Sequence, residues 1–109
     1  MEFNEYQKRT GTTRTAQTKI AGHLYTTLGL VGEAGEVAEK VKKIIRDDGG
    51  VITDERRELL KKEIGDVLWY ISQLSADLGL SLDDVATHNL EKLASRKERG
   101  KITGDGDTR

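Results

Sequence analysis

Apolar residues recur every three or four positions in three stretches of this chain, with polar residues between them. The first stretch covers residues 24–46 and has Leu24, Leu28, Val31, Ala34, Ala38, Val41 and Ile45. The second has Leu60, Ile64, Val67, Leu68, Ile71, Leu74 and Leu78, and the third has Leu82, Val85, Ala86, Leu90 and Leu93. This spacing is the period of an amphipathic helix, and it predicts two long helices followed by a shorter one.

Local signals predict where these helices begin and end. Asp47-Asp48-Gly49-Gly50 ends the first helix, because paired glycines adopt the left-handed conformations that follow a helix C-terminus. Thr53, followed by two acids, is a typical N-cap for the second helix. Ser81 with Asp84 resembles a capping box at the start of the third. The short link between the long helices predicts an antiparallel hairpin.

The two ends of the chain lack such long periodic patterns. Residues 1–22 are polar and rich in threonine, and we expect a short helix around residues 3–7 within an arm that packs on the rest. Residues 100–109 offer almost nothing to bury and predict a mobile tail. The 109 residues together are the size of one domain.

Composition supports an all-α fold and restricts the possible partners. The chain has no proline to interrupt a helix, and it has no cysteine for a disulfide, a zinc-thiolate site or a thiol nucleophile. Its 18 basic and 19 acidic residues give a net charge of -1, so it has no global field to attract nucleic acid or an anionic membrane. Without a leader-like or membrane-spanning segment, we expect a cytoplasmic protein.

Four carboxylates form the most informative pattern. Glu33 and Glu36 are three residues apart on the first long helix, as are Glu63 and Asp66 on the second, so each pair lies on one helix face. Both pairs are symmetric about Gly49-Gly50. In an antiparallel hairpin, Glu33 would therefore lie level with Asp66, and Glu36 with Glu63.

Such a ring of acids requires a cation, because two carboxylates about 5 Å apart repel by roughly 3 kcal/mol at an effective dielectric near 20. Oxygen ligands without histidine or cysteine favour Mg²⁺, or Mn²⁺, over zinc. Alternatively, the acids are ordinary surface residues, because Glu36 and Lys40 are spaced like the ion pairs of a solvated helix face. Against this, no lysine lies four residues after Glu63 or Asp66. Spacing alone leaves both interpretations open.

Other side chains are candidates for contacts with a substrate. Asn89, Lys92 and Arg96 fall on one side of the third helix and could bind phosphate oxygens, or could simply form a solvated basic face. Tyr70 follows the second acidic pair and is a candidate for substrate binding, whereas we expect Trp69 to be a core residue.

The two histidines of the chain and three glycines of the first long helix are not assigned a chemical role. His23 and His88 have no carboxylate or serine at a motif spacing, so neither is proposed as a catalytic base. The glycines Gly29, Gly32 and Gly35 lie within the first long helix and predict a close approach of another helix there.

Three segments together resemble a known family, the MazG-like nucleoside triphosphate pyrophosphohydrolases of the all-α NTP pyrophosphatase superfamily. The segments are Leu30-Val31-Gly32-Glu33-Ala34-Gly35-Glu36, Glu63-Ile64-Gly65-Asp66-Val67-Leu68 and Asn89-Leu90-Glu91-Lys92-Leu93, with Arg96. The resemblance covers about residues 24–100. It implies magnesium-dependent hydrolysis of a (deoxy)nucleoside triphosphate to the monophosphate and pyrophosphate, in nucleotide-pool sanitation or control.

The resemblance also implies roles for individual residues. The four acids would bind the metal, and Glu33 would in addition orient the attacking water. Asn89, Lys92 and Arg96 would lie on the phosphate side of the substrate. Members of the family are dimers or tetramers, which implies that a homo-oligomer completes the helical bundle here.

This sequence departs from the family pattern at two positions. Gly32 stands where many relatives have a further glutamate, so the number of metals and the identity of the catalytic base are open. Lys43 stands where some dCTP-specific relatives have a tryptophan. Two alternatives remain: a related enzyme directed at dUTP, dCTP or an alarmone, and a non-catalytic helical module that senses nucleotides or assembles.

Overall fold

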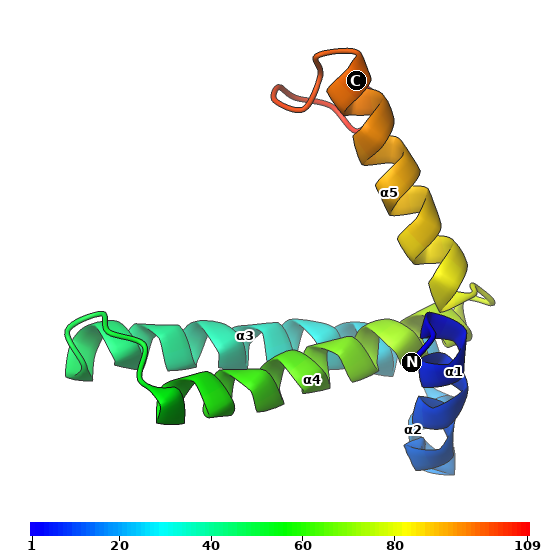
Figure 1. The fold of residues 1–109 in the computed structure, drawn as a ribbon. Helices are drawn as coiled ribbons and strands as arrows, with labels where there is room; N and C mark the ends of the chain where they lie inside the picture. The colour runs from blue at the N-terminus through cyan, green and yellow to red at the C-terminus, as the bar shows by residue number, and fades with distance from the viewer.

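The computed structural model describes residues 1–109 and is all-helical, as the sequence predicts (Figure 1). Its elements, in chain order, are α1 (Phe3–Thr10), the short 3₁₀ helix η1 (Gly11–Thr13), α2 (Ala16–Ile20), α3 (His23–Asp47), α4 (Asp54–Asp77) and α5 (Leu82–Glu98). The two long helices and the third helix fall where the apolar periodicity places them. No helix combines the length and the apolar character needed to cross a membrane.

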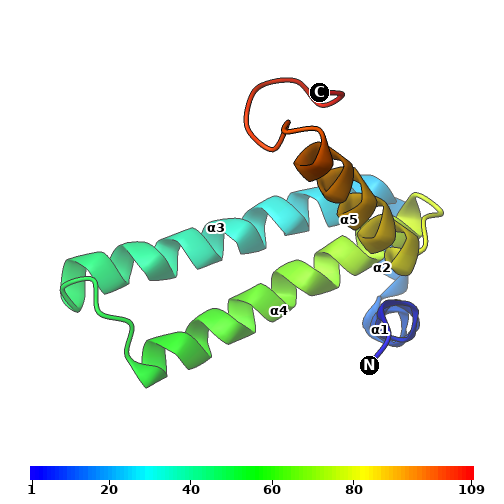
Figure 2. The same cartoon turned by 45° about the horizontal axis from the view of Figure 1, so that its top comes forward.

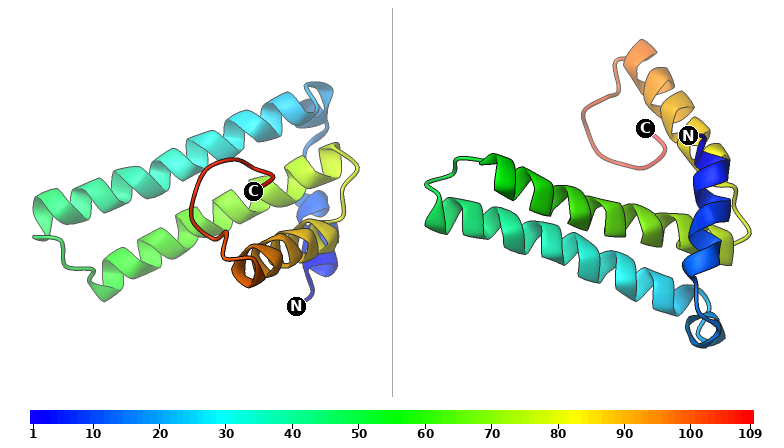
Figure 3. Two further views of the ribbon diagram at one scale, coloured as in Figure 1. Left: turned by 90° about the horizontal axis from the view of Figure 1, so that it is seen from above. Right: turned by 60° about the horizontal axis from the view of Figure 1, so that its bottom comes forward.

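Helices α3 and α4 lie side by side and run in opposite directions (Figures 1 and 3). Gly49 and Gly50 in the link have φ angles of 60° and 81°, the left-handed conformations expected there. The backbone N–H of Gly50 donates to the carbonyl of Ile44 at 3.1 Å. Arg56 Nε donates to a carboxylate oxygen of Asp48 at 2.7 Å and thereby ties the start of α4 to the link.

Helix α3 has two lines of side chains spaced every three or four residues, and only one of them is protected from solvent. The protected line consists of buried or half-buried residues: Thr26, Leu30, Glu33, Val37, Lys40 and Ile44. The apolar line from Leu24 to Ile45 noted in the sequence is exposed along its whole length, with Leu28 74% and Val31 67% exposed. The more apolar face of α3 is therefore not the face that contacts α4.

The N-terminal arm contains more structure than the sequence pattern indicates. Helix α1 extends to Thr10 rather than ending near residue 7, and α1 packs against α4 and α5. The Arg14 side chain is 1% exposed and both of its terminal nitrogens donate to the carboxylate of Asp77, each at 3.1 Å. Thr26 Oγ1 also donates to Asp77 at 2.8 Å. A buried polar network thus joins the arm to both long helices.

Helix α5 leaves the hairpin at a steep angle and projects away from it (Figures 1 and 2). The Ser81 hydroxyl accepts the backbone N–H of Asp84, as expected for an N-cap. At the other end, residues 100–109, for which the sequence predicts a mobile tail, fold back beside the end of α5 (Figure 3). Arg96 Nη2 donates to the carbonyl of Asp107 at 2.6 Å, and Arg99 donates to the carbonyl of Arg109.

The single chain has little apolar core. Of the nine buried residues, only Ile44 and Leu82 are hydrophobic, and the other seven are polar or charged. The accessible surface is 7916 Å², whereas a compact monomer of this mass exposes about 6000 Å². The radius of gyration is 16.9 Å, compared with about 13 Å for a compact domain of this length. The chain therefore exposes much more surface than a self-contained domain.

Candidate metal centre

Three of the four predicted acids meet where α3 and α4 are adjacent. Glu33 from α3 and Glu63 and Asp66 from α4 each offer a carboxylate oxygen, and these oxygens lie within 4.8 Å of one another. Glu33 and Glu63 are half-buried, and Asp66 is exposed. Glu36 is exposed and lies outside this cluster. Although Glu36 is one turn from Glu33, it falls next to the protected line of α3 rather than within it.

The local electrostatics match a site that requires a cation. Burial raises the pKa of Glu33 above its ordinary value, and the charges of Asp66, Glu63 and Glu36 raise it further. Ionising Glu33 therefore costs free energy that a bound cation would recover. The donor set contains only carboxylate oxygens, which fit Mg²⁺ or Mn²⁺ and suit zinc poorly.

Sequence spacing did not identify the cation that already neutralises one member of the cluster. Lys40 Nζ lies 2.9 Å from Oε1 of Glu63, whereas the sequence suggested that Lys40 would pair with Glu36 on its own helix. The hydrogen bond with Glu63 raises the pKa of Lys40. The absence of a lysine four residues after Glu63 therefore does not leave this carboxylate unpaired, because the lysine comes from the neighbouring helix.

Two aromatic residues stand beside the acidic cluster. Thr13, Trp69 and Tyr70 line an open pocket of about 330 Å³ together with Glu33 and Asp66. The structure thus places Tyr70 next to the acids. Trp69 is half-buried rather than a core residue, and its Nε1 donates to Thr13 Oγ1 at 2.8 Å.

The position of Tyr70 depends on one glycine of α3. A Cβ atom at position 29 would overlap the Tyr70 ring, so the close approach predicted from the glycines is confirmed at Gly29. At Gly32 and Gly35 an added Cβ would meet nothing within 4 Å, so no other helix of the same chain approaches these two glycines closely. A hydrogen bond with Tyr25 is the main cause that raises the pKa of Tyr70 to about 12, and burial is the second cause.

The structure does not bring the predicted phosphate-side residues to the acids within one chain. Asn89 and Lys92 are exposed on α5, which projects away from the hairpin (Figure 1). Arg96 is buried against the C-terminal segment and donates to Asp107. None of these three residues lines a pocket with the acidic cluster.

Five polar residues lie in one line along α4, at a spacing of three or four, and they have two different roles: Glu63, Asp66, Tyr70, Gln73 and Asp77. Glu63, Asp66 and Tyr70 border the acidic site, whereas Gln73 and Asp77 bind Arg14 of the N-terminal arm. The sequence contained a signal for this second role, because two polar residues four apart on a helix need partners when they are buried. It did not show that the partner lies 63 residues earlier in the chain.

Comparison with known proteins identifies the family to which these features correspond. The model of the MazG nucleotide pyrophosphohydrolase domain matches residues 21–100. The chain is also similar to the Gene 37 protein of Mycobacterium phage L5, with 58% identity over 90 residues, which are 83% of this chain and 79% of the phage protein. No solved structure matches the chain.

Proposed function

This chain belongs to the MazG family of nucleotide pyrophosphohydrolase domains, and we propose that it hydrolyses (deoxy)nucleoside triphosphates between the α and β phosphates with the help of Mg²⁺. The products are the nucleoside monophosphate and pyrophosphate. We further propose that the enzyme acts in the cytoplasm, where it controls or sanitises the nucleotide pool.

The main support for this proposal is the meeting of Glu33, Glu63 and Asp66 within 4.8 Å, beside a pocket that also contains Tyr70. These three carboxylates would hold the metal, and Glu36 is one helical turn away, where it could supply a fourth. When bound, the metal supplies positive charge that offsets the charge developing on the phosphate oxygens.

The chain's own residues would perform the remaining steps. Glu33 is half-buried and lines the pocket together with Asp66, so its carboxylate can accept a hydrogen bond from a water in that pocket. We assign it to orient the attacking water and take its proton. The water oxygen forms a bond to the α phosphorus, the bond between this phosphorus and the bridging oxygen breaks, and pyrophosphate leaves. Tyr70 would contact the substrate from the side of the pocket.

We propose that a second copy of the chain completes the fold and the site. The exposed apolar line of α3 includes Leu28 and Val31, and Leu90 on α5 is 68% exposed. The surface in excess of a compact monomer, about 1900 Å² for the single chain, is large enough for an obligate interface. Because α5 projects away from the hairpin and neither Asn89 nor Lys92 lines the pocket of the acids, these two residues would contact phosphates bound to the partner.

The reaction is tested by incubating the protein with a panel of nucleoside triphosphates and Mg²⁺ and separating the products by chromatography. We expect the monophosphate and pyrophosphate in equal amounts. Release of orthophosphate would show that a different bond is cleaved. A dUTP- or dCTP-directed enzyme would hydrolyse only that part of the panel, and an alarmone-directed enzyme would hydrolyse an alarmone added as a separate substrate.

The acidic site is tested by Asp66→Asn, which keeps the size of the side chain and removes its charge. We expect turnover to fall at least a hundredfold with native helicity retained. The matched control is Glu58→Gln, which changes an exposed acid of the same helix that pairs only with Lys61. If both variants keep wild-type turnover, the acids are not the site. Nucleotide binding without any product across the panel would instead support the non-catalytic module.

A further inference from the structure

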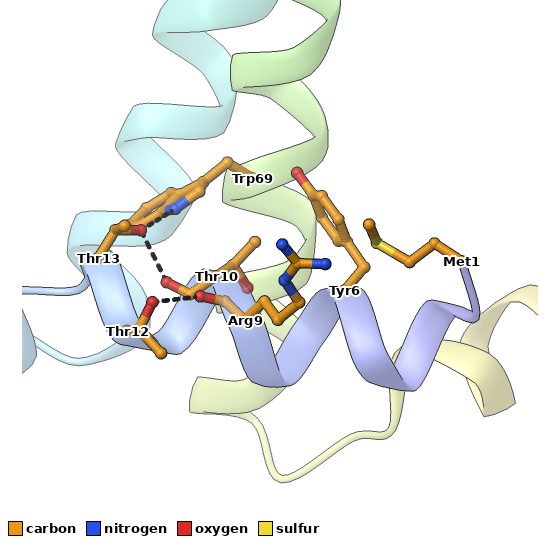
Figure 4. A pocket seen from close by; sticks show the side chains of 7 residues that line it. All are labelled: Met1, Tyr6, Arg9, Thr10, Thr12, Thr13 and Trp69. Atoms are coloured by element: carbon orange, nitrogen blue, oxygen red, sulfur yellow. Dashed lines mark hydrogen bonds between the residues drawn. The ribbon is translucent and has the colours of Figure 1, made fainter.

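A second pocket adjoins the acidic site on the far side of Trp69. It has a volume of about 510 Å³ and lies between the N-terminal arm and α4 (Figure 4). Tyr6, Arg9, Thr12 and Met1 of the arm line it, together with Trp69 of α4 and Thr13. In Figure 4 these side chains gather around one opening, with the Arg9 guanidinium beside the Tyr6 ring. Its volume is in the range of pockets that bind small molecules.

We infer that this pocket binds the nucleobase of the triphosphate, with the indole of Trp69 as its stacking surface and Arg9 as its hydrogen-bond donor. The inference rests on the proposed function, because that function places the phosphates at Glu33 and Asp66. It adds the part of the site that distinguishes one nucleotide from another.

The two pockets share a wall, so one ligand can occupy both. Trp69 and Thr13 line the nucleobase pocket and also the pocket that contains Glu33 and Asp66. Tyr6, on the opposite wall of the nucleobase pocket from Trp69, is affected by the charge of Asp66: burial raises the pKa of Tyr6, and Asp66 raises it further. A ligand with its phosphates at the acids can therefore place its base next to Trp69.

Trp69 is held in a fixed position although it is only half-buried. Its indole N–H donates to Thr13 Oγ1 at 2.8 Å, and its ring meets the Tyr70 ring edge-on, with centroids 5.0 Å apart. An immobilised aromatic face that solvent can reach is suited to stacking, and every nucleobase offers a face for it.

The hydrogen-bonding groups of the pocket give a preference among bases. The hydroxyls of Thr10, Thr12 and Thr13 already donate to backbone carbonyls. Arg9 carries the only positively charged side chain of the pocket, and its one ion pair is with exposed Glu5 at 3.6 Å. Two parallel guanidinium N–H groups match the O6 and N7 acceptors of guanine, whereas adenine presents a donor at the corresponding edge. We therefore expect guanine nucleotides to bind more tightly than adenine nucleotides.

The fluorescence of Trp69 tests the inference directly, because the chain has one tryptophan. The probes are the α,β-methylene analogues of dGTP and dATP, which resist hydrolysis, and inorganic tripolyphosphate, which has no base; all are titrated with Mg²⁺. We expect quenching by both nucleotide analogues, tighter binding of the dGTP analogue, and little change with tripolyphosphate. An equal response to bound tripolyphosphate, or no response to a nucleotide whose binding calorimetry confirms, would overturn the inference.

Variants separate stacking from a general loss of structure. We expect Trp69→Ala to raise KM about tenfold or more with a smaller effect on kcat, and Trp69→Phe to recover part of the loss. Arg9→Gln should reduce the preference for dGTP over dATP. Phe3→Ala is the matched control, because it truncates an aromatic residue of the same arm that does not line the pocket. Unchanged KM in Trp69→Ala and unchanged base preference in Arg9→Gln would contradict the inference.

The outcomes also distinguish this inference from the proposed function. If the wild-type protein hydrolyses triphosphates but the fluorescence of Trp69 responds to no nucleotide, the assignment of the nucleobase pocket is wrong and the proposed function stands. If nucleotides quench Trp69 but no triphosphate is hydrolysed, the pocket stands and the proposed reaction fails.

Discussion

Lys40 Nζ lies 2.9 Å from Oε1 of Glu63, so a lysine of α3 neutralises one of the three carboxylates that the two long helices bring together. The ion pair spans the hairpin at the site proposed for the metal. It stabilises the cluster in the absence of a cation, and it also competes with a cation for the same oxygen.

Replacing Lys40 with methionine should strengthen the binding of Mg²⁺ several-fold, because Glu63 is then free to coordinate it. The same change should lower the melting temperature of the metal-free protein, since the carboxylates lose their nearest cation. Isothermal titration calorimetry and thermal denaturation in chelator measure the two effects. Lys43→Met is the control, because Lys43 contacts Glu39 and not the cluster. Weaker metal binding in Lys40→Met would show that Lys40 positions Glu63 rather than competing for it.

The raised pKa of Glu33 should make the stability of the metal-free protein depend on pH. Its folded-state pKa is raised above the ordinary value of 4.5, so the folded state binds this proton more tightly than the unfolded state. Stability should therefore fall as pH rises from 4.5 through the folded pKa. Glu33→Gln removes this loss and should melt at a higher temperature than wild type above that range, and at a similar temperature below pH 4.5. Melting curves from pH 3.5 to 7 in chelator test this; parallel curves for the two proteins would contradict it.

Gly29 and Gly32 should respond oppositely to alanine. Alanine stabilises an exposed helix position by up to about 1 kcal/mol relative to glycine, and position 32 has open space for the added Cβ. At position 29 the Cβ would overlap the Tyr70 ring, and overpacking of this kind typically costs about 1–3 kcal/mol. Denaturant titrations give the free energies of unfolding. Equal effects at the two positions would show that Tyr70 moves aside freely.

Arg14 should be a major contributor to stability. Its side chain is 1% exposed and is paired with Asp77, so Arg14→Ala leaves a carboxylate with Thr26 as its remaining side-chain partner. Breaking a buried pair in this way costs about 3–5 kcal/mol. Arg57→Ala, which removes an exposed pair with Asp54, should change the unfolding free energy by less than about 1 kcal/mol. A small effect of Arg14→Ala would mean that the arm is not held by this network.

The exposed apolar line of α3 should determine the oligomeric state. Leu28→Glu places a charge in that line and should shift the protein to smaller species in sedimentation experiments, with reduced turnover if a partner chain contributes to the site. Gln17→Glu adds the same charge at an exposed polar position of α2 and should leave the assembly intact. A monomeric wild-type protein would overturn this prediction.

The sequence by itself determined the helices and the residues that bound them. Apolar spacing placed α3, α4 and α5, and Thr53, Ser81 and the Gly49-Gly50 pair set their ends, because caps and left-handed glycines act on backbone groups a few residues away. The residue types of the acidic site were also readable, since two acids three apart on a helix share a face whatever surrounds them.

Only the tertiary structure decided which line of α3 faces α4. A helix can have more than one line of residues at a spacing of three or four. In α3 the line containing Thr26, Glu33 and Lys40 is the protected one, although the line from Leu24 to Ile45 is more apolar. Periodicity indicates that a helix face is suited to burial, but it does not indicate which neighbouring helix covers that face.

The sequence pattern also did not predict the contacts between segments that are distant in the chain. Lys40 pairs across the hairpin, Arg14 reaches Asp77, and α5 projects away from the hairpin. Long charged side chains can meet partners on any adjacent element, so their pairing depends on how helices cross and not on spacing within one helix. The sequence thus determined which groups could do chemistry, and the packing of the helices determined which of them meet.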